Sequence, residues 1–74
     1  MSIITVKLIE GTLSAAQKLR LAKNLTDTLV AIEGEVMRPV TWCIIEDIRD
    51  GQWSIGGQPL RRKDIRGITG RNGR

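Results

Sequence analysis

Ser2 has the most distinctive chemistry in this sequence, because removal of Met1 would give it a free α-amine. A small second residue normally permits that removal. An α-amine has an ordinary pKa of about 7.7–8.0, lower than that of a lysine side chain, and a nonpolar, cationic site lowers it further. At the start of a strand and inside an oligomer interface, such an amine can act as a general base. The alternative interpretation is that Ser2 is an ordinary chain end.

Other groups with catalytic chemistry are scarce. The 74 residues include no histidine, which excludes Ser-His and Cys-His catalytic pairs and the usual zinc sites. Cys43 is the single cysteine and lies among apolar residues, which favours a buried, unreactive thiol and excludes a disulfide within the chain. Glu46, Asp47 and Asp50 could gather around a hard cation, but three acids at a strand end are more typical of a solvated edge. We therefore predict no metal site.

The positive charge of the chain is concentrated at its C-terminal end. The formal net charge is +4, from 12 Lys and Arg against 8 Asp and Glu. Residues 1–60 are close to neutral, whereas residues 61–74 contain mostly basic and glycine residues and predict a flexible, basic tail. Aromatic residues that could stack on bases are missing from the tail, which argues against nucleic-acid binding. The alternatives are pairing with acids of neighbouring subunits and a contribution to solubility.

The pattern of residues 1–60 predicts a single α+β domain. Residues 2–9 are rich in β-branched side chains and predict a strand with two largely apolar faces. Ser14 and Gln17 have capping-box spacing and predict the start of a helix that ends at Gly34. Its apolar stripe is expected to contain Ala15, Leu19, Ala22, Leu25 or Thr26, Leu29 and Ile32.

A turn at Arg38-Pro39 precedes a second predicted strand over residues 40–45. Strand, helix and strand in this order predict a βαβ unit with two parallel strands and a right-handed crossover. Residues 52–57 predict a short C-terminal hairpin or an extended arm. Trp42 is expected in the core, whereas Trp53 is as well suited to a pocket wall or an interface.

The size of the chain and the first strand together predict an oligomer. Parallel sheets are normally covered on both faces, and one helix covers only one face of a two-stranded sheet. A chain of this length also has a small core and no disulfide to support it. The apolar runs are too short to span a membrane, and no signal-peptide h-region is visible, so a cytoplasmic protein is expected.

Over residues 2–62 the chain resembles the 4-oxalocrotonate tautomerase family. The resemblance rests on a strand that starts at residue 2, a helix opened by Ser14, and three motifs. The motifs are Leu8-Ile9-Glu10-Gly11, Ile44-Ile45-Glu46-Asp47 and, most specifically, Gly51-Gln52-Trp53-Ser54-Ile55-Gly56-Gly57. The resemblance implies short βαβ subunits in a hexamer, a trimer of dimers, without cofactor or metal. It also implies isomerisation of a small unsaturated 2-oxo acid between its enol and keto forms.

The family's site residues are largely replaced here. Its base is an N-terminal proline, arginines bind the substrate carboxylate and polarise its carbonyl, and an aromatic side chain keeps the pocket apolar. The proline position is Ser2, and the arginine positions are Thr12 and Trp42, with Arg38 a few residues from the latter. Ile9 and Trp53 agree with the family. Loss of two arginines removes charge-assisted hydrogen bonds worth about 1.5–3 kcal/mol each, so weak activity is expected.

Three functions are compatible with this pattern. The first is a tautomerase-like isomerase with Ser2 as base, Trp53 as pocket wall, and Arg38 or a neighbour's Arg61 or Arg62 as anion contact. The second is a catalytically silent subunit that forms a hetero-oligomer with a proline-bearing paralogue. The third is a binding or scaffold protein that uses a homohexamer and its basic tails.

Overall fold

The computed structural model describes residues 1–64, whose main elements are four strands and two helices. In chain order these are β1 (Ser2–Ile9), α1 (Ala15–Glu33), the 3-10 helix η1 (Glu35–Val40), β2 (Thr41–Ile48), β3 (Trp53–Ile55) and β4 (Gln58–Leu60). They belong to two compact units. The first contains Met1–Lys7 and Leu13–Glu46, and the second contains Leu8–Thr12 and the described residues from Asp47 onward.

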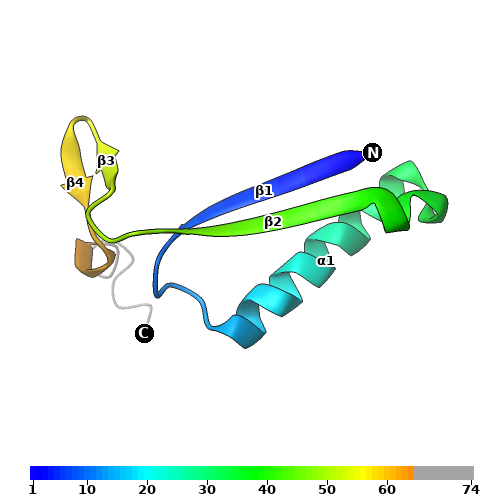
Figure 1. Ribbon diagram of the computed structural model, residues 1–74, viewed down its shortest axis with the longest axis horizontal. Coiled ribbons are helices and arrows are strands. Elements are labelled where there is room, and N and C mark those ends of the chain that lie inside the picture. Colours follow the sequence, from blue (N-terminus) through cyan, green and yellow to red (C-terminus); the bar gives the residue numbers. More distant parts are fainter. Residues whose placement is uncertain (65–74) are drawn as a thin grey trace. The chain divides into compact units, whose positions relative to one another are not determined.

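Strands β1 and β2 form a parallel two-stranded sheet, and α1 is the crossover between them (Figure 1). The predicted βαβ unit is therefore confirmed. Side-chain exposure alternates along both strands with the period of two that a strand imposes. Within the first unit, one sheet face is half-buried and contains Ser2, Ile4, Val6, Thr41, Cys43 and Ile45. The opposite face is exposed and contains Ile3, Thr5, Lys7, Trp42, Ile44 and Glu46.

Helix α1 has the predicted ends. Ser14 accepts a hydrogen bond from the Gln17 amide while the Gln17 side chain accepts one from the Ser14 amide, which completes the capping box. At the other end Gly34, with φ of 111°, donates its amide to the Val30 carbonyl. A positive φ of this kind favours glycine, because other residues would place Cβ against the backbone.

The buried face of α1 differs in part from the predicted stripe. Leu21, Ala22, Leu25 and Leu29 are half-buried and Val30 is only 3 % exposed, whereas Leu19 is 74 % and Ile32 81 % exposed. Apolar residues occur on more than one side of the helix, so periodicity alone could not choose between them. The last turn of α1 is followed by η1, and the two helices contact each other. Val30, in the last turns of α1, is the buried residue of the helix.

Strand β2 is longer than its apolar sequence indicates. It continues to Ile48, because charged side chains are compatible with an exposed sheet face. Glu46 in this extension pairs with Lys7 of β1 at 2.8 Å, a contact between neighbouring strands. Residues 35–40 form the 3-10 helix η1, which includes the turn predicted at Arg38-Pro39 and also Val40, which was predicted as the first residue of the strand.

In the second unit, β3 and β4 form the predicted hairpin. Trp53 pairs with Leu60 and Ile55 with Gln58, in antiparallel register. Gly56 and Gly57 between them have φ of 59° and 84°, as the two central residues of a tight hairpin turn require. Residues 62–64 of the predicted tail are helical, and Arg61, which directly precedes them, exchanges hydrogen bonds with Asp64. The remainder of the predicted tail lies outside the described residues. None of the helices in residues 1–64 has the length and apolar character needed to cross a membrane.

Candidate active site

Ser2 lies where the start of β1, the start of β2 and the end of α1 come together (Figure 1). This meeting follows from the topology, because a crossover helix runs antiparallel to the two parallel strands that it connects. Glu33, the last residue of α1, joins the three elements. Its Oε1 accepts a hydrogen bond from Ser2 Oγ and its Oε2 accepts one from Thr41 Oγ1, both at 2.7 Å.

These contacts hold Glu33 in its ionised form. The hydroxyl of Thr41 lowers the pKa of the Glu33 carboxyl most, followed by the hydroxyl of Ser2, and the N-terminal ammonium adds a favourable charge interaction. Burial acts in the opposite direction and is outweighed. A negative charge is not favoured at a helix C-terminus, where the helix dipole is itself negative. The donors from the two strands therefore stabilise a carboxylate that the helix end does not.

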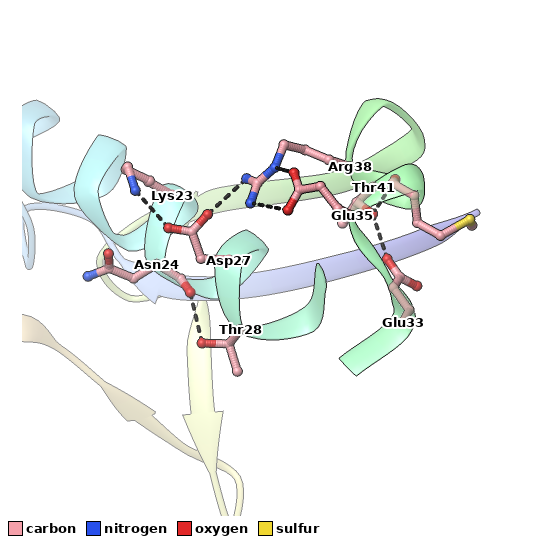
Figure 2. A network of polar contacts seen from close by, with 9 residues as sticks. Lys23, Asn24, Asp27, Thr28, Glu33, Glu35, Arg38 and Thr41 are labelled. Atoms are coloured by element: carbon pink, nitrogen blue, oxygen red, sulfur yellow. Dashed lines mark hydrogen bonds and ion pairs between the residues drawn. The ribbon is translucent and has the colours of Figure 1, made fainter. Parts of the chain in front are cut away.

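Arg38, a candidate anion contact, is engaged with two carboxylates (Figure 2). Its Nη1 lies 2.8 Å from Asp27 Oδ1, and its Nε and Nη2 donate to Glu35. Hydrogen bonds from Lys23 first and Arg38 second lower the pKa of Asp27, and those from Arg38 lower the pKa of Glu35. The same pairs raise the pKa of Arg38. The positive charge of Arg38 is thus balanced within the first unit.

Trp42 lies on the exposed face of the sheet and not in the core of the chain. It is 52 % exposed, and its neighbours on that face include Ile3 at 59 % and Ile44 at 43 %. The expectation of core packing is therefore wrong for the single chain. The alternation of β2 explains the outcome, because Cys43 and Ile45 occupy the half-buried face and Trp42 must point the other way.

In the second unit, Ile9 and Thr12 lie at the turn that ends β1. Ile9 is only 5 % exposed, and its carbonyl accepts hydrogen bonds from the amide and the hydroxyl of Thr12. Gly11, with φ of 80°, permits the tight turn between them. Thr12 therefore closes the turn that ends β1, at the position to which the resemblance assigns an arginine.

Arg62 brings a guanidinium to this turn from the other end of the described chain. Its Nη1 donates to the Gly11 carbonyl oxygen at 3.2 Å, and its amide donates to Asp50 Oδ1 at 2.9 Å. The Asp50 amide in turn donates to Glu10 Oε2 at 3.0 Å. These residues line a cavity of about 310 Å³ in the second unit. The separation of 51 positions between Arg62 and Gly11 left no signal in the sequence.

The predicted site residues are thus divided between the two units. Ser2, Arg38 and Trp42 belong to the first, while Ile9, Thr12 and Trp53 belong to the second. Trp53 is half-buried in β3, opposite Leu60. Among residues 1–64, no three acidic, cysteine or histidine side chains gather as ligands for a metal ion.

Comparison with known proteins decides the family. The sequence pattern of the family described as tautomerase enzyme matches residues 3–63. The chain belongs to the tautomerase family. The match covers elements of both compact units, and it confirms the resemblance that the strand-end and Ser-Ile-Gly-Gly motifs predicted. The search of curated proteins found no match to the chain.

Solved structures of tautomerase-family proteins have the same fold. Apo unfused 4-OT is 30 % identical, with a TM-score of 0.69 over 80 % of this chain and 93 % of that one. A 4-oxalocrotonate tautomerase homologue is also 30 % identical, with a TM-score of 0.68 over 77 % and 87 %. TomN, a 4-oxalocrotonate tautomerase homologue in the tomaymycin biosynthetic pathway, is 24 % identical, with a TM-score of 0.71 over 89 % and 94 %. At the identity of TomN, the similarity concerns the fold.

Proposed function

We propose that the protein is an isomerase that interconverts the enol and keto forms of a small unsaturated 2-oxo acid. The observation that carries this proposal is the family match over residues 3–63, which begins directly after Ser2. In this reaction one proton leaves the enol oxygen and one is added to carbon, so no oxidant or reductant is consumed. The α-amine of Ser2, exposed by removal of Met1, is the proposed proton carrier.

Arg62 is the proposed contact for the substrate carboxylate. Arg38 is less suited to this role because Asp27 and Glu35 already balance its charge. The guanidinium of Arg62 instead bonds a neutral carbonyl, that of Gly11, next to the family's arginine position at Thr12. In an oligomer the base and the anion contact can belong to different copies. Ile9 and Trp53 are the proposed apolar walls.

A homo-oligomer is part of the proposal. The exposed face of the β1–β2 sheet includes Ile3, Trp42 and Ile44, which are 59 %, 52 % and 43 % exposed in the single chain. Burial of such side chains contributes roughly 25 cal/mol for each Å² of apolar surface removed from water. We propose that further copies of the chain cover this face, in the hexamer that the family resemblance implies.

A silent subunit within a hetero-oligomer is the second candidate function. It is favoured by the Glu33 carboxylate, which is bonded to the side chain of the residue that would supply the base. A neighbouring anion keeps an amine protonated, and a protonated amine accepts no proton. In this case a paralogue that begins with Met-Pro would supply the base.

Two variants at position 2 distinguish these functions. Ser2→Ala keeps a small residue, and with it Met1 removal and a free amine, whereas Ser2→Gln retains Met1 and removes the amine from that position. Intact mass verifies each N-terminus, and native mass gives the assembly. Isomerisation of a simple enol-pyruvate, weak but retained in Ser2→Ala and lost in Ser2→Gln, supports the amine as base. Equal rates in both variants contradict it.

A further inference from the structure

Glu33 connects Ser2 to the rest of the first unit through both of its carboxylate oxygens. Oε1 accepts from Ser2 and Oε2 from Thr41, and all three residues are half-buried. The two donors are the first residues of β1 and β2. The carboxylate therefore fixes the position of the Ser2 side chain relative to the sheet.

The hydrogen bonds leave a negative charge on Glu33 with which a cation can interact. A threonine hydroxyl has a single hydrogen, and Thr41 Oγ1 also lies 2.8 Å from the Met37 carbonyl oxygen. Thr41 can therefore donate to Glu33 only part of the time. The last turn of α1 contains no basic residue. The N-terminal ammonium is the cation that lowers the pKa of Glu33.

Several other charged groups of the first unit pair with one another. On α1 and η1, Lys23 pairs with Asp27, and Arg38 pairs with Asp27 and Glu35 (Figure 2). On the strands, Lys7 pairs with Glu46 on the exposed sheet face. Glu33, at the end of α1, is the carboxylate that bonds the first residue of β1.

Removal of Met1 would move the ammonium onto Ser2 itself. The Ser2 nitrogen is three covalent bonds from Ser2 Oγ, which is 2.7 Å from Glu33 Oε1. An opposite charge within about 4–6 Å favours the charged form of an amine and raises its pKa by about one unit or more. This direction is opposite to the one that a general base near neutral pH requires.

We propose that Glu33 is a positioning residue for the Ser2 amine, which it anchors through the Ser2 hydroxyl and holds in the ammonium form. The inference rests on the proposed function, in which that amine is the base. It deepens that function by making the base active on the alkaline side of neutrality, and it predicts weak activity at pH 7. Glu33 itself touches no reacting atom in this mechanism.

The test measures the amine directly, with Glu33→Gln as the variant. Glutamine is isosteric, and its amide can donate to Thr41 Oγ1 while Thr41 donates to Met37, so the bridge between the elements is retained without the charge. The pH dependence of labelling of the Ser2 amine by an acylating reagent gives its pKa. Glu35→Gln is the matched control, since Glu35 pairs with Arg38 and not with Ser2.

We expect an amine pKa above 8 in the unmodified protein, lowered by about one unit in Glu33→Gln and unchanged in Glu35→Gln. High salt should lower the pKa of the unmodified protein toward that of Glu33→Gln, a readout that needs no variant to fold. Equal pKa values in the unmodified protein and Glu33→Gln overturn the inference.

Kinetics separate this inference from the proposed function. If both are correct, Glu33→Gln gains up to about tenfold in kcat/KM at pH 7, because a tenfold larger fraction of the amine is free. Its pH-rate profile moves to lower pH by the same amount. A lowered pKa without activity in either protein supports the role of Glu33 and contradicts the proposed function. Activity together with the same amine pKa in both proteins supports the proposed function and contradicts the role of Glu33.

Discussion

Lys7 of β1 and Glu46 of β2 form an ion pair of 2.8 Å on the exposed face of the two-stranded sheet. Their side chains are 57 % and 51 % exposed, and Ile3, Trp42 and Ile44 lie on the same face. An exposed pair of this kind contributes little by itself, because water and salt screen it. An apolar patch beside a charged pair is instead typical of a surface that recognises another protein.

A substitution on this face is expected to dissociate the oligomer. Trp42→Glu places a charge among apolar side chains and should weaken subunit association by about 2 kcal/mol or more, the usual effect of losing an interface tryptophan. Leu19→Glu is the control, since Leu19 is 74 % exposed on α1 and not on the sheet. Sedimentation velocity at micromolar concentration measures the outcome. A folded species near 8 kDa in the unmodified protein would contradict both the oligomer and the interface.

The arginine substitutions are expected to differ in their effect on substrate binding. Arg62→Ala should raise KM about 10–100-fold, the equivalent of one charge-assisted hydrogen bond. Arg38→Ala should leave KM within about twofold, because Asp27 and Glu35 occupy its guanidinium. Arg61→Ala is the neighbouring control for loss of tail charge. Steady-state kinetics with a 2-oxo acid measure all three, and a raised KM in Arg38→Ala alone would reverse the assignment.

Most of the fold could be predicted from local patterns. The β-branched run at 2–9, the capping box at Ser14 and the glycine at 34 each require a particular backbone conformation, and the structure has it at those positions. The buried face of α1 could not be predicted as reliably, because α1 has apolar side chains on more than one side. Packing against the rest of the unit decides which of them are buried. The length of β2 could not be predicted either, because its last three residues include two charged side chains, Glu46 and Asp47, which an apolar strand pattern does not include.

The candidate site could be predicted only where single residues carry its chemistry. The amine of Ser2 follows from its position in the chain, and the replacements at Thr12 and Trp42 follow from comparison with the family pattern. The roles of Glu33 and Arg62 depend on contacts over 31 and 51 positions, which only the tertiary structure creates. Glu33 also lacks any sequence signal, since an acid at a helix end usually indicates a solvated side chain.

Acid should destabilise the first unit through its paired carboxylates. Asp27, Glu33 and Glu35 all have pKa values lowered in the folded state, with ordinary values of 3.8, 4.5 and 4.5. Groups whose pKa is lowered on folding contribute stability that is present above the ordinary value and is lost as the pH falls through the folded value. We therefore expect Tm to fall steadily below about pH 4.5.

Arg38→Ala tests the cause of this pH dependence. It removes the guanidinium that lowers the pKa of Glu35 and, second to Lys23, that of Asp27, so Tm should depend less steeply on pH below about pH 4.5. Arg38→Lys keeps the charge but not the planar guanidinium, so its slope of Tm against pH should lie between those of the unmodified protein and Arg38→Ala. Calorimetry at fixed ionic strength measures the slopes. Parallel curves for all three proteins would show that these pairs make no pH-dependent contribution.

Restoring the family's residues should restore activity, and the two restorations should act together. Ser2→Pro returns a ring amine, but without a cation at position 12 the gain in kcat/KM should be partial. Thr12→Arg adds that cation and loses the hydroxyl bond to Ile9, while the amide of residue 12 can still donate to the Ile9 carbonyl at 3.1 Å. A base is useful only when substrate is held within its reach, so the double variant should exceed the product of the single gains. Thr12→Gln is the control for side-chain length without charge. Full family-like activity in the unmodified chain would contradict this prediction, and Arg62→Ala would then be expected to abolish most of that activity.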